Sequence, residues 1–206
     1  MRAMIGIIDY GMGNLHSVEK ALVKLNAQTL IIQKPAQLAE LSALVLPGVG
    51  AFDPAMQRLS EGGWVLPLQQ WVGQQKPLLG ICLGLQLLFE SSDEGCLPGL
   101  QLLAGKVAPL PQIPGEPIPH MGWAPLELTA SNSLFVPGST PDWMYFVHSY
   151  AAIPVDPSCI TAYAPYGTSK VVASVGRGAL QATQFHPEKS GNAGLLMLRR
   201  WLQTLP

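Results

Sequence analysis

Residues 78–90 read LLGICLGLQLLFE, and this stretch decides the expected fold. Leu78–Ile81 is a short apolar run typical of a buried strand, and Leu85–Glu90 continues as an apolar helix. Between them, GICLG at residues 80–84 has the pattern of a nucleophile elbow in which the sulfur of Cys82 takes the place of a hydroxyl oxygen. Glycine is needed on both sides of the turn because the backbone there is strained and packs closely against its neighbours.

The elbow predicts a reactive role for Cys82. It places the side chain at the carboxyl edge of a sheet, where ligands bind in open α/β folds. A helix starting near Leu83 puts partial positive charge beside the sulfur, which favours the thiolate. The alternative is a small buried cysteine packed between glycines. Strand, elbow and helix in register favour the nucleophile.

The residues before the elbow alternate between strand-like and helix-like patterns. Such alternation implies right-handed crossovers and a parallel sheet. Leu15, Val18 and Leu22 recur at helical spacing, for example. We expect strands at Met4–Asp9, Thr29–Ile32 and Ala43–Leu46, and helices at 15–26 and over most of Phe52–Gln75.

After residue 100 the pattern changes, and Pro109–Pro119 is rich in proline. Gly176-Arg177-Gly178 predicts a hairpin turn, and Ala193–Leu202 a closing helix. Strands are expected at Trp143–Tyr150, Cys159–Tyr163, Val171–Val175 and Ala179–Phe185. The expected fold is therefore a three-layer α/β domain spanning residues 1–206, with a mainly parallel central sheet and an antiparallel extension in the second half.

Composition excludes several functional classes. The net charge is -1 and no Lys or Arg stripe is present, so a nucleic-acid partner is not expected. No apolar stretch is long enough to span a bilayer. The three cysteines have no metal-ligand spacing, and their odd number is typical of a reducing compartment. We expect a cytoplasmic protein without membrane, metal or cofactor.

The low charge has two readings. Charged residues make up 12% of the chain, against about 25% in an average domain. Either Gln, Ser and Thr solvate the surface, or a partner covers part of it.

A nucleophilic thiol needs a base and the base needs an orienting group. His186-Pro187-Glu188 follows the expected strand Ala179–Phe185, so it ends a strand as the elbow does. Two-residue spacing can turn both side chains to one side, and Glu188 can then accept a hydrogen bond from the imidazole. The alternative is an incidental surface turn. We favour a Cys82-His186-Glu188 triad.

Acyl transfer also needs hydrogen-bond donors for the oxyanion. One candidate is the backbone N–H of Leu83, and a second is the PGVG turn at residues 47–50, whose glycines let the backbone approach a substrate. An ordinary strand-to-helix turn is the alternative for PGVG. The YGMGN stretch at residues 10–14 lacks the lysine and the third glycine of a phosphate loop, so nucleotide binding is not expected.

In these residues the chain resembles the class I glutamine amidotransferases, whose elbow commonly reads G-x-C-x-G-x-Q. Within that group it looks like the glutaminase subunits of imidazole glycerol phosphate synthases. The blocks are in the family's order and cover nearly the whole chain. They are DYGMGNLHS (9–17), LPGVGAF (46–52), HMGW (120–123), YFVHSY (145–150) and QFHPEKS (184–190).

The resemblance implies that Cys82 attacks the carboxamide of L-glutamine, that His186 shuttles the proton and that Glu188 orients His186. Ammonia then leaves, and the glutamyl thioester is hydrolysed. It also implies an oxyanion site at Gly50 and Leu83. The residues implied to bind glutamine are Gly48, Gln86, Glu94, Ser149 and Tyr150.

A partner is implied as well: a (βα)8-barrel cyclase subunit that receives the ammonia and makes imidazole glycerol phosphate and AICAR in histidine biosynthesis. The two subunits would form a heterodimer. The glutaminase residues run from Gly48 to Glu188 and leave no room for an acceptor-substrate domain, which supports this expectation. The residues implied to face the partner are Asn14, His120, Met121, Trp123 and Lys189.

The chain departs from the family pattern at three positions. Leu85 stands where methionine is common, and Ala124 and Gly191 where asparagine and glutamine are frequent. The last two put details of signalling between the subunits in doubt.

Three other functions are alternatives. They are the amidotransferase subunit of anthranilate or aminodeoxychorismate synthesis, a cysteine peptidase or γ-glutamyl hydrolase using the same triad, and a non-catalytic interaction module. The DYGMGN and HMGW blocks argue against the first, and the intact triad against the last. High glutaminase activity without any partner would favour the second.

Overall fold

The computed structural model describes residues 3–129, 134–135 and 143–206. Its largest sheet has eight strands in the order β2-β1-β3-β4-β13-β12-β11-β8. The strand bounds are β1 (Met4–Ile8), β2 (Gln28–Ile32), β3 (Ala43–Gly48), β4 (Leu78–Cys82), β8 (Glu127–Leu128), β11 (Ile160–Tyr166), β12 (Ser169–Arg177) and β13 (Leu180–Thr183). Neighbours from β2 to β13 are parallel, and β12, β11 and β8 continue the sheet antiparallel. The expected mainly parallel sheet with an antiparallel extension is confirmed.

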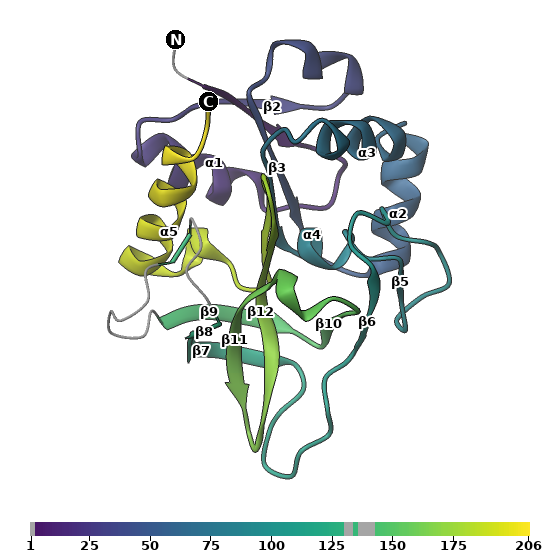
Figure 1. Cartoon of the computed structure of the whole chain (residues 1–206), viewed down its shortest axis with the longest axis vertical. Coiled ribbons are helices and arrows are strands. Elements are labelled where there is room, and N and C mark those ends of the chain that lie inside the picture. Colours follow the sequence, from purple (N-terminus) through teal and green to yellow (C-terminus); the bar gives the residue numbers. More distant parts are fainter. Residues whose placement is uncertain (1–2, 130–133, 136–142) are drawn as a thin grey trace.

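Helices cover both faces of this sheet. Figure 1 shows α1 (Leu15–Lys24) and α5 (Gly191–Gln203) on one side, and α2 (Phe52–Glu61) and α3 (Val65–Gly73) on the other. Each side has its own buried cluster: Leu22 and Trp201 belong to one, and Phe52 and Trp71 to the other. The apolar stripe of each helix is therefore buried against the sheet, which makes three layers.

Two smaller sheets flank the carboxyl edge of the large one. One contains β10 (Tyr150–Pro154), β6 (Gly105–Pro109) and β5 (Ser91–Ser92); the other is a ribbon of β7 (His120–Pro125) and β9 (Trp143–His148). Three short 3-10 helices complete the described elements: η1 (Pro35–Glu40), η2 (Pro157–Cys159) and η3 (Pro187–Lys189). The sequence predicted none of β5, β6, β7, β8 or β10, because these strands are short or contain proline.

Two expected segments differ in detail from the observed elements. Phe52–Gln75 is not one helix, because Gly62 and Gly63 break it and Gly63 has a φ of 68°. This turn buries Trp64 between the two helices' ends. Trp143–Tyr150 is not one strand, because the chain leaves the ribbon at Ser149 and enters a different sheet as β10.

The elbow and the hairpin differ in detail from their expected bounds. The helix after the elbow, α4 (Leu83–Gln86), begins at Leu83 and ends four residues before Glu90. The apolar run that follows it forms turns instead, and is buried. The hairpin between β12 and β13 turns at Gly178, whose φ is 59°, and Gly176 lies within β12.

At the elbow, Cys82 has a φ of 56° and a ψ of -111°. Its flanking glycines are required by close packing. A Cβ at Gly80 would lie 3.0 Å from the Cβ of Ala182 on β13, and a Cβ at Gly84 would overlap the carbonyl oxygen of Leu46 on β3. The turn is thus held against the strands on both sides of β4.

We predict that Gly84→Ala destabilises the protein. The added methyl has no room against the Leu46 carbonyl, so the free energy of unfolding should fall by roughly 1–3 kcal/mol, as overpacking does in other cores. Denaturant unfolding followed by circular dichroism measures it. Gly73→Ala in α3 is the control, since nothing lies within 4 Å of its Cβ. Equal unfolding midpoints for the two variants would contradict the prediction.

Candidate active site

The three residues of the expected triad lie at one edge of the large sheet. Cys82 ends β4, and His186 and Glu188 follow β13, which is the parallel neighbour of β4 with Thr183 opposite Ile81. Carboxyl ends of parallel strands meet at the same edge, so residues 104 positions apart are brought together (186 minus 82). Cys82 and His186 both line a cavity of about 360 Å³.

His186 and Glu188 form a buried pair. Nδ1 of His186 lies 2.8 Å from Oε1 of Glu188, and both side chains are almost fully buried. Ser190 fixes the backbone around them: its Oγ donates to the carbonyl of His186 at 2.6 Å and accepts from the N–H of Tyr145 at 2.9 Å. The His186 N–H in turn donates to the carbonyl of Tyr145 at 3.0 Å. The imidazole is thus anchored to β9.

Electrostatics favour a protonated imidazole. Burial alone lowers the pKa of His186, but the Cys82 sulfur and the Glu188 carboxylate together favour the charged form more strongly, and the pKa rises to about 9. Nε2 of His186 is buried and has no partner with good hydrogen-bond geometry among the described residues. The Cys82 sulfur therefore acts on His186 electrostatically, without a formed hydrogen bond. Nε2 is the ring atom left for proton transfer, because Nδ1 faces Glu188.

A buried glutamine contacts Cys82. Nε2 of Gln184 lies 3.8 Å from Sγ of Cys82, and its Oε1 accepts from Nε2 of Gln86 at 3.1 Å. Nε2 of Gln86 also donates to the carbonyl of Tyr150 at 3.0 Å. Sequence reasoning assigned no role to Gln184, although it opens the QFHPEKS block. Its burial at the end of β13 gives it access to the sulfur.

The glycine loop after β3 lies beside the elbow. Gly50, with a φ of 99°, and Leu83 line the cavity. Gly48 pairs with Cys82 in the sheet and is absent from the cavity lining: a Cβ there would lie 2.6 Å from the hydroxyl of Tyr10 and 2.9 Å from Cβ of Leu83. Gly48 thus lies behind the wall of the cavity, and its expected contact with glutamine remains a prediction.

The other residues expected to bind glutamine line the same cavity. They are Gln86, Glu94, Ser149 and Tyr150. Val49, in the PGVG turn, also lines it, and sequence reasoning missed three further lining residues: Pro119, Val147 and His148. Alternation along YFVHSY was the available indication for His148, because it predicts that Phe146 and His148 share the buried face of a strand.

His148 is held in its neutral form. Its Nδ1 donates to the carbonyl of Tyr150 at 2.8 Å, so its Nε2 is left as an acceptor for Nδ1 of His120 at 3.2 Å. Burial lowers the pKa of His148 to about 4, although the bond to Tyr150 acts in the other direction. Burial also lowers the pKa of His120, which stacks on Phe146 at 5.0 Å.

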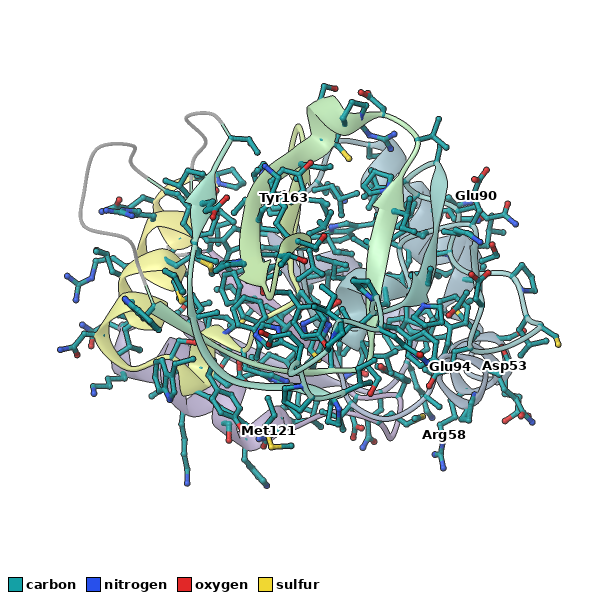
Figure 2. The ribbon with its side chains drawn as sticks, turned by 90° about the horizontal axis from the view of Figure 1, so that it is seen from below. Asp53, Arg58, Glu90, Glu94, Met121 and Tyr163 are labelled. Atoms are coloured by element: carbon teal, nitrogen blue, oxygen red, sulfur yellow. The ribbon has the colours of Figure 1, made fainter. Side chains whose placement is uncertain are left out.

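The residues expected to face a partner differ in exposure. Met121 and Trp123 on β7 are 60% and 52% exposed, and Trp123 lies edge-on to Tyr145 of the paired strand β9. Met121 is labelled near the lower outline of the molecule in Figure 2. Lys189 is exposed, whereas Asn14 and His120 are half-buried.

Comparison with known proteins places this geometry in a family. The family described as "Glutamine amidotransferase class-I" matches residues 6–203. The chain belongs to the class-I glutamine amidotransferases. The resemblance inferred from the sequence blocks is confirmed.

Two relatives within the class-I amidotransferases carry the name of the same enzyme subunit. "Imidazole glycerol phosphate synthase subunit HisH" of Synechococcus sp. (strain CC9605) is 55% identical over 205 residues, covering 100% of this chain and 96% of that protein. "Imidazole glycerol phosphate synthase subunit HisH 2" of Prochlorococcus marinus (strain MIT 9313) has the same identity, length and coverage. At this level of identity and coverage, the chain belongs to the HisH branch of the family.

Solved amidotransferase structures share the fold. PurLQS from Thermotoga maritima superposes with a TM-score of 0.75 at 15% identity, covering 98% of this chain and 99% of that one. A glutamine amidotransferase from the same organism has a TM-score of 0.65 at 18% identity, with coverages of 98% and 82%.

Among the described residues, no helix is long and apolar enough to span a membrane.

We predict that His148 makes the protein less stable in acid. Its pKa of about 4 lies below the ordinary value of 6.5, so the unfolded chain binds the extra proton between these pH values. The free energy of unfolding should therefore fall as pH drops from about 6.5 to about 4, by up to about 3 kcal/mol from this residue. Denaturant unfolding across that range measures the slope.

His148→Gln should flatten this slope, whereas His16→Gln at an exposed position of α1 should leave it unchanged. An unchanged slope in His148→Gln would show that another group carries the acid sensitivity.

Proposed function

We propose that the chain hydrolyses L-glutamine to glutamate and ammonia with Cys82, His186 and Glu188 as its catalytic triad. One observation carries this proposal: the sulfur on a strained elbow lines the same cavity as the histidine of a buried His–Glu pair. Membership of the class-I glutamine amidotransferases supports L-glutamine as the substrate. We assign the activity to a single domain spanning residues 1–206.

The reaction has two halves. Sγ of Cys82 attacks the carboxamide carbon, and Nε2 of His186 gives its proton to the departing nitrogen, so that ammonia leaves and a γ-glutamyl thioester remains. Water then attacks the thioester while His186 takes its proton, and glutamate is released as the thiol is restored. Glu188 holds Nδ1 of His186 throughout, which keeps Nε2 on the side of the sulfur.

Neighbouring residues bind the substrate and stabilise the developing charge. The backbone N–H of Leu83 and the Gly50 loop supply donors to the oxyanion. Gln86, Ser149 and Tyr150 line the pocket around the side chain of glutamine, and the Glu94 carboxylate binds its α-ammonium group. Gly48 shapes the wall from behind, where only a glycine fits beside Tyr10.

The ammonia is used by another subunit. The relatives are named as subunits of imidazole glycerol phosphate synthase, and this name implies a second chain. We infer that it is a (βα)8-barrel cyclase that makes imidazole glycerol phosphate and AICAR in histidine biosynthesis, in a cytoplasmic heterodimer.

The outer face of the β7–β9 ribbon supports such a partner. Met121 and Trp123 are exposed apolar side chains, and Trp143 at the end of β9 is 54% exposed. Exposed apolar patches of this kind are typical of protein–protein contacts. Asn14, His120 and Lys189 complete the surface that we assign to the cyclase.

Cys82→Ala should abolish glutamine-dependent synthesis by the complex, by about 10³-fold or more, because the thioester cannot form. The reaction driven by added ammonium should be unchanged, because it bypasses the thiol. Steady-state assays with the two nitrogen sources measure both. Cys159→Ala, away from the cavity, is the control. Loss of both reactions in Cys82→Ala would make Cys82 a structural residue.

A glutamine-analogue electrophile should label Cys82 and spare Cys96 and Cys159, because only Cys82 lines the proposed glutamine pocket. The contrast is informative because Cys96 is exposed and Cys82 is buried, so exposure alone would favour Cys96. Peptide mass spectrometry after the treatment gives the sites. Equal labelling of all three thiols by the analogue would remove the case for a glutamine pocket at Cys82.

A further inference from the structure

The loop that carries Glu94 is tied to the start of α2 by hydrogen bonds in both directions. Oε2 of Glu94 accepts from the N–H of Phe52 at 2.9 Å. In return, the Asp53 carboxylate accepts from the N–H groups of Cys96 at 2.8 Å and Leu97 at 3.0 Å. Figure 2 labels Glu94 and Asp53, the second residue of α2, on the same side of the molecule. We call these three bonds the Asp53–Glu94 clamp.

The loop sequence is shaped to admit the Asp53 carboxylate. A Cβ on Gly95 would overlap that carboxylate, whose atoms are its three nearest neighbours. Gly95 has no left-handed φ, so its backbone conformation does not itself require glycine. The missing side chain at position 95 therefore makes room for the Asp53 carboxylate.

Electrostatics favour the same arrangement. The first turn of α2 is the positive end of a ten-residue helix, where a carboxylate such as Asp53 is stabilised. Ala51 at the N-cap provides no side-chain acceptor, and Glu94 supplies one from outside the helix. Hydrogen bonds to ionised acceptors are stronger than neutral ones, so the clamp is stiffer than an ordinary turn.

We propose that Asp53 is a positioning residue for glutamine binding, acting through Glu94. Rigid attachment of the loop holds the Glu94 carboxylate at the cavity, with Oε2 bound to Phe52 and Oε1 directed to the α-ammonium of glutamine. The inference rests on the proposed contact between Glu94 and glutamine. Without Asp53, only the bond from Phe52 to Glu94 remains of the three clamp bonds, although Asp93 still pairs with Lys106 and Val107 on β6. The Glu94 carboxylate is then less well fixed before glutamine binds, and fixing it costs binding energy.

The effect should fall on KM and leave kcat unchanged. The α-ammonium is at the opposite end of glutamine from the reacting carboxamide, so loss of the clamp removes binding shared by ground state and transition state. A general disturbance of the fold would instead lower kcat or the amount of active enzyme. This difference separates positioning from mere structural support.

The experiment uses the chain in complex with its cyclase. Asp53→Asn keeps the shape and removes the charge and one acceptor, and Gly95→Ala displaces the carboxylate by a methyl group. Each should raise the KM for glutamine about tenfold, which corresponds to about 1.4 kcal/mol. In each, kcat should stay within about twofold, and the ammonium-driven rate should be unchanged.

A double-mutant cycle sharpens the result. Asp53→Ala leaves room for a methyl at position 95, so Asp53→Ala with Gly95→Ala should have the same KM as Asp53→Ala alone. If the increases in KM were additive, Asp53 and Gly95 would act independently and the clamp would be refuted. Glu61→Gln on α2 and Gly73→Ala on α3 are matched controls outside the clamp, and both should keep the normal KM.

Glu94→Gln distinguishes failure of the proposed Glu94–glutamine contact from failure of the clamp. If it leaves the KM unchanged, the proposed contact between Glu94 and glutamine is wrong and the role of Asp53 falls with it. If Glu94→Gln raises the KM while Asp53→Asn and Gly95→Ala do not, the contact stands and the clamp is refuted. Thermal melting of each variant checks that it is folded, and retained kcat is a second check.

Discussion

Cys82 adopts a φ of 56°, which costs a residue with a side chain about 1–3 kcal/mol, and the packing of Gly80 and Gly84 against the flanking strands maintains it. Relaxation is blocked because the turn has backbone on one side and Ala182 on the other. The turn places Cys82 and Leu83, the first residue of α4, at the same cavity. The proposed oxyanion donors, the proposed glutamine pocket and the proposed base all lie around this turn.

The large sheet is made of two halves of the chain that meet at the site. β1 to β4 come from residues before 83, and β8, β11, β12 and β13 come from residues after 126. The only contact between the halves within this sheet, among its described strands, is the pairing of β4 with β13. We call this pairing the seam. Cys82 ends one strand of the seam, and His186 follows the other.

Local patterns were sufficient for much of this architecture. The strand–glycine–helix pattern located Cys82, and the expected strand Leu78–Ile81 differs from β4 by one residue. The two-residue spacing of His186 and Glu188 is likewise local, and the structure brings their side chains within hydrogen-bonding distance.

The features that the sequence did not predict depend on distant partners. Alternation in YFVHSY does not say that the chain changes sheets at Ser149. Gln184 reads as an ordinary strand residue until Gln86, 98 positions away, is placed beside it. The carboxylate of Asp53 reads as a favourable helix start, and its bonds to a loop 43 residues away are visible only in three dimensions.

The seam also governs when the protein can become active during its synthesis. A growing chain has the elbow and its thiol early, but β13 is among the last elements to be made, and pairing strands so far apart in sequence is slow. Until then the thiol has neither base nor pocket wall. With the proposed triad, a truncated or half-folded chain cannot hydrolyse glutamine, since Cys82 and His186 meet only when β13 has joined the sheet.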